Sequence, residues 1–266
     1  MTEETQKADC LLYEVNGAVA RITFNRPAAL NAIDIDMAAA FREAIVQVET
    51  DPAVRVLVLR GAGRAFMAGG DVAQLAEDPV NNPDRIIAPL HDGLARMANL
   101  PIPVVAVLHG AVAGAGMSIA LAADLALAAD NVTFQMAYTR LGASPDASGS
   151  WHLVRLVGLR KAMALTLLNE AVDAQAALEL GLVNWVVPAD ELDTRAEKLT
   201  RQLAEGAVQA FGRSKALLRG AALRTLPEQL EAERQAFQEG ARGAEFREGT
   251  EAFLQKRRAD FMGASQ

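Results

Sequence analysis

The chain opens with an alternation of hydrophobic and polar positions that then changes period. Residues 11–25, LLYEVNGAVARITFN, alternate around an Asn-Gly pair, which predicts a β-hairpin. Residues 34–49 carry apolar side chains at helical spacing, and either Asp34 or Asp36 can cap the start of that helix. The first part of the chain is therefore predicted to form two strands followed by a helix.

Continuous apolar runs separated by a helical pattern follow. Residues 54–63, VRVLVLRGAG, and residues 104–110, VVAVLHG, are predicted to be buried strands, and residues 85–99 between them a helix. Residues 124–136 supply two more short strands around an Asp-Asn turn. Strands that alternate with helices are typical of an α/β fold with crossover connections.

After Trp151 the pattern becomes mostly helical. Five segments between residues 152 and 241 have helical spacing, and only LVNWVVP at 182–188 reads as a strand. We predict a core over residues 1–188 and a C-terminal helical layer over residues 189–266. The layer is an extension of the core, because no low-complexity linker separates the two.

One apolar run has the length of a membrane helix. Residues 104–123 carry no formal charge at neutral pH. Three glycines at positions 110, 114 and 116 interrupt this run, however, and two prolines precede it. These turn signals favour a buried strand, a glycine-rich turn and a buried helix in a protein without a membrane span.

Composition and charge narrow the class of protein. The 266 residues are 51% hydrophobic and 22% charged, as in soluble globular proteins, and a net charge of −7 disfavours a nucleic-acid partner. The single cysteine, Cys10, excludes an intramolecular disulfide and a cysteine metal cluster. The first ten residues are acidic and polar, unlike a signal peptide. We expect a cytoplasmic protein.

Two glycine-rich stretches are candidates for ligand binding. Each of the stretches 63–75 and 109–128 follows a strand and leads toward a helix. Small residues let a ligand approach the backbone, and N–H groups at a helix start are unpaired donors that suit a developing negative charge. The two turns together could form an oxyanion hole. Tight turns and close packing are the alternative explanation, and neither stretch matches a phosphate-binding loop.

Other chemistry has less support in the sequence. The three histidines, His91, His109 and His152, have no close histidine or cysteine partners, so we expect no metal site. Ser118 lies inside a predicted helix and not in a G-x-S-x-G turn, which favours a packing role. His91 is predicted on a helix surface, where it would act as a base only if it lined a site. Core filling is the simplest role for the three methionines at 67, 117 and 136.

Several motifs together resemble the crotonase, or enoyl-CoA hydratase/isomerase, superfamily. They are ITFNRPAALNAI, RAFMAGGDV, HGAVAGAGMSIALAADLALA, FQMAYTRLGASPD and FREGTEAFLQKRRADF, and the likeness covers nearly the whole chain. The resemblance implies a spiral of ββα units, a homotrimer or hexamer, and an acyl-CoA ligand with no cofactor beyond its coenzyme A. It also implies that two backbone N–H groups, those of Gly70 and Ala115, bind the thioester oxygen.

Departures from the family pattern bear on the reaction. A typical hydratase of the family has one glutamate where this chain has Ser118 and a second where it has Tyr138. Such a pair activates water and delivers a proton, work that an alcohol and a phenol do poorly near neutral pH. The remaining acid is Asp146 in SPDASGSW, which resembles the corresponding loop of the ring-opening isomerase of phenylacetate breakdown and of the chlorobenzoyl-CoA dehalogenase.

Asp146 has two interpretations. By itself, it would be predicted to cap the helix that runs past Trp151. With the resemblance, we predict that Asp146 is the acid/base of an isomerase that moves a double bond from Δ3 to Δ2 or rearranges an unsaturated ring acyl-CoA. The alternatives are an enoyl-CoA hydratase, an aryl-CoA dehalogenase or hydrolase in which Asp146 is the nucleophile and His91 assists, and a CoA-binding protein without turnover.

The coenzyme A moiety is predicted to lie along NRPAALNA and FMAGGDV. Small residues there leave room for the ligand, and a basic residue near the C-terminus would offset phosphate charge. The predicted binding residues are Ala28, Leu30, Ala68, Gly69, Asp71, Val72, Gly114, Tyr138 and Lys256, with Arg257 as the alternative to Lys256.

Overall fold

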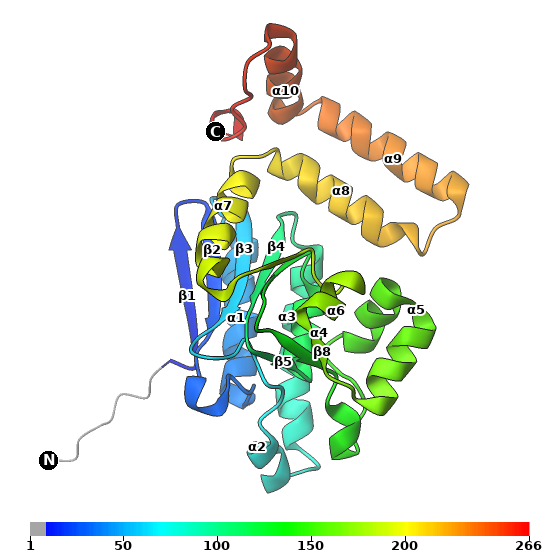
Figure 1. The fold of residues 1–266 in the computed structure, drawn as a ribbon. Helices are drawn as coiled ribbons and strands as arrows, with labels where there is room; N and C mark the ends of the chain where they lie inside the picture. Colours follow the sequence, from blue (N-terminus) through cyan, green and yellow to red (C-terminus); the bar gives the residue numbers. More distant parts are fainter. Residues whose placement is uncertain (1–8, 266) are drawn as a thin grey trace, which may run out of the picture.

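The computed structural model describes residues 9–265, and its core is a six-stranded sheet (Figure 1). The strand order is β1-β2-β3-β4-β6-β9. β1 and β2 form the predicted antiparallel hairpin, and the remaining neighbours pair in parallel. The strands span Leu11–Asn16 (β1), Val19–Phe24 (β2), Val56–Gly61 (β3), Val104–Leu108 (β4), Leu125–Ala129 (β6) and Trp185–Val187 (β9). The predicted α/β class is confirmed.

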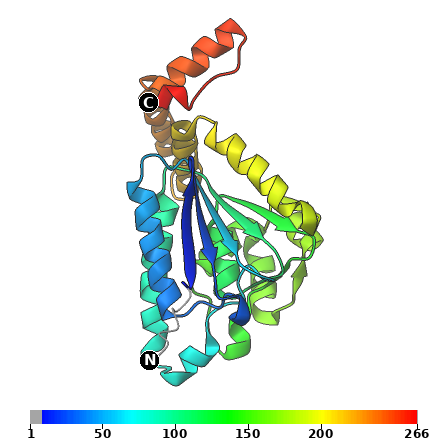
Figure 2. The same ribbon diagram turned by 90° about the vertical axis from the view of Figure 1, so that its left-hand side faces the viewer.

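The continuous apolar runs in the sequence arise because both faces of this sheet are covered (Figure 2). Leu57 and Leu59 of β3 pack in the cluster that includes the buried faces of α1 (Ile35–Thr50) and α3 (Asn82–Asn99). Their neighbours in β3 point the opposite way and pack with α7 (Leu192–Ala204). A strand buried on both faces has no solvent-exposed face, so its sequence does not alternate between apolar and polar residues.

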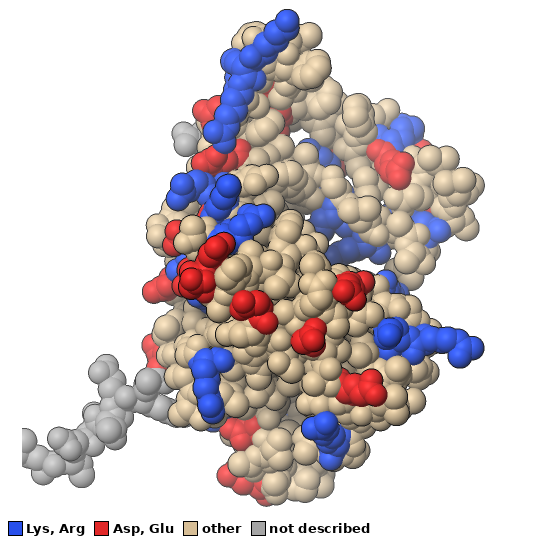
Figure 3. Space-filling view, in the orientation of Figure 1, with Lys and Arg blue, Asp and Glu red and all other residues tan. Residues whose placement is uncertain are grey.

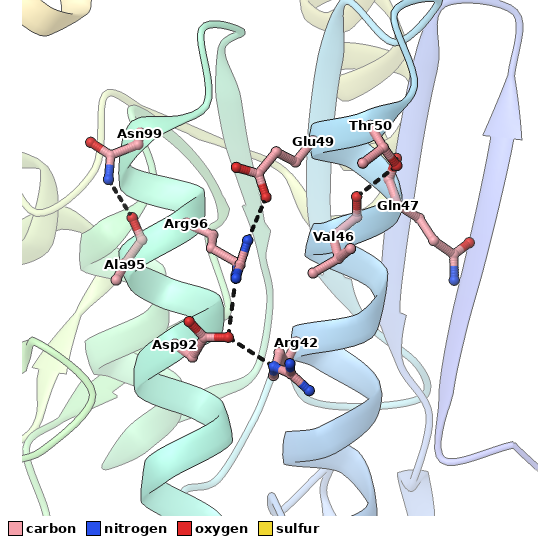
Figure 4. Close-up of polar contacts among 9 residues, drawn as sticks. All are labelled: Arg42, Val46, Gln47, Glu49, Thr50, Asp92, Ala95, Arg96 and Asn99. Carbon is pink, nitrogen blue, oxygen red and sulfur yellow. Dashed lines mark hydrogen bonds and ion pairs between the residues drawn. The ribbon is translucent and has the colours of Figure 1, made fainter.

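Helices α1 and α3 lie side by side and are joined at their surfaces by ion pairs (Figure 4). Asp92 of α3 binds Arg42 of α1 at 2.8 Å, and Arg96 binds Glu49 at 2.8 Å. Exposed pairs of this kind contribute little, so packing decides the position of α3. A Cβ at Gly93 would lie 2.9 Å from the ring of Phe41, so glycine is what allows the two helices to approach this closely.

The start of α1 follows the sequence prediction. Asp34 is its N-cap, and the Asp34 carboxylate accepts from the Met37 N–H at 2.8 Å. Helix α3 starts at Asn82, a few residues before the predicted start at 85, with a proline in its first turn. Pro83 fits there because the first N–H groups of a helix need no intrahelical acceptor.

The glycine-rich run after β4 contains more regular structure than predicted. It forms a strand, β5 (Ala111–Ala113), where a turn was predicted, and then α4 (Ala115–Ala122). β5 belongs to a second sheet with β7 (Thr133–Gln135) and β8 (Val172–Asp173). Its pairing comes from residues distant in the sequence, which local turn signals cannot reveal. Among residues 9–265, no helix is both long and apolar enough to cross a membrane.

Further elements connect these layers. One of them, α2, is the helix to which the first glycine-rich stretch leads, and it is brief and capped by Asp71. Helix α5 is kinked at Gly158, whose φ is 75°. The connecting elements are η1 (Pro27–Ala29), α2 (Val72–Glu77), η2 (Tyr138–Leu141), α5 (Gly149–Leu168), α6 (Ala174–Glu179) and η3 (Ala189–Glu191).

The C-terminal helices extend away from the core (Figure 1). They are α8 (Val208–Ala221), α9 (Leu226–Ala241) and α10 (Ala244–Gln255), followed by η4 (Gly263–Ser265). Helix α8 is attached to the core through Lys215, whose Nζ lies 2.7 Å from Asp124 and donates to the Ile102 carbonyl. Helix α7, in contrast, covers the sheet itself. The division of the chain at residue 188 stays a prediction.

Candidate active site

The first glycine-rich stretch is held between two other segments. On one side the Ile33 N–H donates to the Gly69 carbonyl at 2.8 Å, and the Asp71 N–H donates to the Ile33 carbonyl at 2.9 Å. On the other side Met67 pairs with Val112 of β5. These bonds bring the two predicted glycine-rich stretches together at one place.

Two polar residues that the sequence analysis left without a role fix this arrangement. Asn31 is fully buried, and its amide donates to the carbonyls of Ala62, Ala65 and Phe66. Arg26 binds Asp71 at 2.8 Å and also contacts Asp34 at 3.2 Å. Both lie in the motif NRPAALNAI, in which three polar residues stand among apolar ones without a helical or strand period. The lack of a helical or strand period was the signal in the sequence that could have drawn attention to these two residues.

The N–H groups of Gly70 and Ala115 point away from the surrounding structure. In a trans peptide the C=O and the next N–H point in opposite directions. The Gly69 carbonyl accepts from Ile33, so the Gly70 N–H points away from Ile33. The Gly114 carbonyl accepts from the Ser118 N–H inside α4, so the Ala115 N–H points out of the helix start. Within residues 9–265, neither donor has an acceptor.

The two turns that carry these donors are in contact. A Cβ built on Gly114 would lie 3.3 Å from the Cα of Gly69, and both glycines have positive φ, at 52° and 118°. Only glycine combines this backbone conformation with so close an approach. The pair of outward N–H groups can therefore act as a joint hydrogen-bond site for an oxygen that gains negative charge.

A chain of hydrogen bonds links three side chains beside these donors. The Tyr138 hydroxyl donates to Asp146 Oδ1 at 2.5 Å and lies 2.9 Å from Ser118 Oγ. Ser118 is fully buried in α4, one turn after Ala115. A Cβ at Gly149 would lie 2.2 Å from Ser118 Oγ, so glycine allows the start of α5 to pack on α4. The carboxylate is thereby tied to the helix that supplies one N–H donor.

Tyr138 stays a hydrogen-bond donor in this chain. Burial of the phenol, followed by the negative charge of Asp146 and the hydrogen bond to it, raises the pKa of Tyr138 well above its usual value. The phenol is therefore protonated at any physiological pH and cannot serve as a general base. No described residue donates to the second oxygen of Asp146, Oδ2.

Asp146 does not cap a helix. Helix α5 begins at Gly149 with Ser148 at the N-cap position, and no side chain there accepts from the helix start. The Asp146 backbone carbonyl accepts from the Gly149 N–H at 2.9 Å, while its side chain turns to Tyr138. The capping interpretation is therefore wrong, because the Asp146 carboxylate accepts from Tyr138 of η2 and not from the start of α5.

The donors and the carboxylate border one cavity of about 690 Å³. Its walls are mainly apolar side chains of α2, α3 and the loop after η2. Among the described residues that line it, Asp146 is the only carboxylate and Tyr138 the only other side chain that ionises. The lining includes Gly70, Val72, Leu75, Ile86, Leu90, Ala115, Tyr138, Leu141 and Asp146.

The structure brings together some of the predicted ligand-binding residues and not others. Ala68, Gly69, Val72, Gly114 and Tyr138 line the cavity. Ala28 is exposed on η1, and the Leu30 carbonyl accepts from the Ala68 N–H beside the cavity. Lys256 lies at the end of α10, remote from α2 and the cavity (Figure 1), and Arg257 is paired with Glu248.

Asp71 has a structural role as well. It caps α2 and binds Arg26. Partial burial opposes ionisation, but the hydrogen bonds from Arg26 and the Gln74 N–H outweigh it and hold the pKa of Asp71 below its usual value. Within residues 9–265, no three His, Cys, Asp or Glu side chains are grouped so that they could hold a metal ion.

The remaining candidates lie outside the cavity. Met67, Met117 and Met136 are buried in the core, as predicted. His109 lies 2.9 Å from the Gly63 carbonyl, and His152 lies on α5. His91 accepts a hydrogen bond from the Ala147 N–H at 3.0 Å and does not line the cavity of Asp146.

Comparisons with known proteins agree on one family. The family model for enoyl-CoA hydratase/isomerase matches residues 14–264. The 1,2-epoxyphenylacetyl-CoA isomerase of Escherichia coli is 38% identical over 260 residues, covering 95% of this chain and 98% of that protein. A Rhodobacter capsulatus protein named as a probable enoyl-CoA hydratase is 36% identical, covering 94% and 97%. The structure of an enoyl-CoA hydratase from Polaromonas sp. JS666 matches with a TM-score of 0.89 and 35% identity, covering 94% and 98%.

Proposed function

Because the chain belongs to the enoyl-CoA hydratase/isomerase family, we propose that it is an acyl-CoA isomerase that works through a thioester enolate. Its reaction is the shift of a double bond from Δ3 to Δ2, or the rearrangement of an unsaturated ring acyl-CoA. The observation that carries the proposal is the single carboxylate of Asp146, oriented by Tyr138, in a cavity that also holds the outward N–H groups of Gly70 and Ala115.

The proposed steps use this chain's own groups. The thioester oxygen accepts hydrogen bonds from the Gly70 and Ala115 N–H groups. Asp146 Oδ2 removes a proton from the carbon next to the thioester, and the electron pair moves onto the thioester oxygen to give the enolate. The protonated Asp146 then returns the proton to the carbon at the far end of the former double bond, which leaves the double bond in the Δ2 position.

One carboxylate is enough for this transfer, because the same group removes and returns the proton. Hydration needs both an activated water and a proton for the carbon, and Ser118 and a protonated Tyr138 stand here where a typical hydratase has its two glutamates. A hydratase is thus the second candidate, supported by the name of the Rhodobacter relative. A dehalogenase or hydrolase that uses His91 as its base is disfavoured, because His91 is bonded to the Ala147 N–H outside the cavity.

The coenzyme A moiety is proposed to lie along Ala28, Leu30, Ala68 and Val72, of which Ala68 and Val72 line the cavity. Lys256 ends α10, which lies at the opposite end of the molecule from α2 (Figure 1), so a contact from Lys256 is proposed to come from another copy of the chain. This agrees with the proposed assembly, a homotrimer or hexamer. We place the enzyme in the cytoplasm, where a single cysteine suits the reducing conditions.

Asp146→Asn is the direct test of the proposal. The amide keeps the shape of the side chain but cannot take up and return a proton, so kcat for a straight-chain Δ3-enoyl-CoA should fall about a hundredfold to ten-thousandfold. Thioester affinity, measured by calorimetry, should stay close to that of the wild type, because the Gly70 and Ala115 N–H groups are unchanged.

The same assay separates the alternatives. Wild-type protein is tested on straight-chain Δ3-enoyl, Δ2-enoyl and aryl-CoA thioesters. Turnover of the Δ2-enoyl thioester to a hydroxyacyl product, without isomerisation, would replace the isomerase by a hydratase. An Asp146→Asn variant that keeps isomerase turnover within about threefold of wild type would remove the catalytic assignment. Binding without any product would indicate a CoA-binding protein.

A further inference from the structure

The turn that carries Asp146 adopts a conformation that its residues do not favour. Ala147 and Ser148 follow the acid directly, and both have positive φ, at 48° and 64°. Neither is glycine, so each pays a steric penalty in this left-handed region. Such a conformation persists only when neighbouring structure holds it in place, and the position of the Asp146 carboxylate depends on the same backbone.

His91 supplies a hydrogen bond to this turn from a different part of the chain. The buried Ala147 donates its N–H to His91 Nε2 at 3.0 Å. Among the described residues, the other hydrogen bonds that reach residues 144–148 from outside that segment and α5 are those between Tyr138 and Asp146, through the side chain and the backbone of Asp146. His91 is therefore the outside partner of Ala147, the first of the two strained residues.

The helix that carries His91 is itself fixed. His91 lies on α3 two residues before Gly93, where α3 contacts Phe41 of α1. The next residue, Asp92, binds Arg42 of α1 (Figure 4). An acceptor mounted on this helix can hold the turn at a defined distance from the sheet, and hence from the Gly70 and Ala115 N–H groups.

The hydrogen bond also defines the chemical state of the imidazole. A nitrogen that accepts from an N–H carries no proton, so the proton of neutral His91 is on Nδ1. The ring borders a second cavity, of about 960 Å³, between α3, α5 and α8, where Lys and Arg side chains gather in a hollow (Figure 3). With Nε2 occupied and the ring outside the cavity of Asp146, His91 has no route to a substrate proton.

We infer that His91 is a positioning residue: by accepting from the Ala147 N–H it holds the strained turn and so places Asp146 relative to the two N–H donors. This inference rests on the proposed function for its effect on turnover. It assigns His91 a role different from the base of a dehalogenase or hydrolase, in which the imidazole itself would exchange protons.

Two substitutions at one position separate these roles. His91→Ala removes the acceptor, whereas the side-chain oxygen of His91→Gln can still accept from the Ala147 N–H but cannot act as a base at neutral pH. We expect His91→Ala to lower isomerase kcat about tenfold to a hundredfold through misplacement of the carboxylate, with little change in KM. His91→Gln should recover most of that loss. Asp92→Ala is the control, because it removes neighbouring contacts of α3 without touching the turn.

Hydrogen exchange provides a readout that does not depend on activity. In wild type and His91→Gln the amides of residues 143–149 should exchange slowly, and in His91→Ala they should exchange faster, while peptides from α1 and β3 stay unchanged. If His91→Ala and His91→Gln both lost the slow exchange of these amides and both lost turnover, that result would also support the positioning role. If wild type has no isomerase turnover, the proposed function fails, and the exchange data alone decide this inference.

Two results would overturn it. Unchanged exchange of the turn in His91→Ala would mean that the hydrogen bond does not hold the backbone. A His91→Gln variant with a protected turn but turnover as low as that of His91→Ala would mean that the imidazole itself takes part in proton transfer.

Discussion

At the scale of single residues, the phenol of Tyr138 decides what the Asp146 carboxylate can do. It occupies Oδ1 and is held in turn by Ser118. Oδ2 is left for the cavity, so a carboxylate that would otherwise rotate presents one oxygen in one direction. Hydrogen bonds to charged groups contribute about 1.5–3 kcal/mol, enough to fix such an orientation.

Tyr138→Phe should therefore impair turnover while the ring still fills its site. The variant keeps the aromatic packing but removes the donor to Asp146, and we expect kcat to fall about tenfold to a hundredfold, the equivalent of one charged hydrogen bond. Ser118→Ala, which removes only the outer link, should have a smaller effect. Steady-state kinetics on the same Δ3-enoyl thioester measure both. Equal activity of Tyr138→Phe and wild type would mean that the phenol does not orient the acid.

At the scale of elements, α8 is docked on the core by partly buried positive charges. Arg219 donates to the Ala98 carbonyl at 2.6 Å and binds Asp124 at 2.8 Å, next to Lys215. His152 of α5 borders the same hollow. Burial first, and then the positive charges of Arg219 and Arg155, lower the pKa of His152 to about 4. In the folded protein this imidazole is neutral over most of the acid range.

The pH dependence of stability follows from this shift. The unfolded chain takes up a proton on His152 near pH 6.5, its ordinary value, and the folded protein only near pH 4. Between these values the unfolded state binds more protons, so the contribution of His152 is fully present above about pH 6.5 and is lost as pH falls toward 4. His152→Gln should flatten the fall in unfolding free energy between pH 6.5 and 4.5, measured with urea. An equal slope in wild type and His152→Gln would refute the assignment.

At the scale of the whole molecule, the C-terminal helices expose large apolar side chains. Helices α9 and α10 stand away from the core (Figures 1 and 2), and their exposed apolar residues include Phe237 at 68%, Phe253 at 84% and Leu254 at 80%. Contiguous apolar surface of this kind is typical of an interface between subunits.

We expect a homotrimer or hexamer in solution, with a mass three or six times 28.3 kDa by light scattering. A charge in the exposed apolar surface should weaken the assembly, so Phe253→Asp should shift the protein toward smaller species. Val80→Asp adds the same charge at an equally exposed apolar residue, 82% exposed, away from the C-terminal helices, and should leave the mass unchanged. A wild-type protein that stays monomeric at micromolar concentration would contradict the prediction.

The sequence by itself determined the elements whose signals are local. The Asn-Gly hairpin at 11–24, a cap at Asp34 or Asp36 and the strand of β3 could be predicted because turn chemistry, capping and side-chain period act within a few residues. The sequence also indicated that the glycine-rich stretches could donate hydrogen bonds to a ligand. For Asp146 it left two roles open, a helix cap or a catalytic acid.

Only the tertiary structure excluded the cap, and only it assembled the site. The N–H groups of Gly70 and Ala115 meet because Met67 pairs with Val112, and Asp146 turns from α5 to Tyr138, which is fixed by Ser118 of α4. The physical reason is that Met67–Val112 and Ser118–Tyr138 join residues 45 and 20 positions apart, and Tyr138–Asp146 spans eight residues that follow no regular period. Their formation depends on strand order and helix packing. A local period or spacing in the sequence therefore cannot predict which side chains will be in contact.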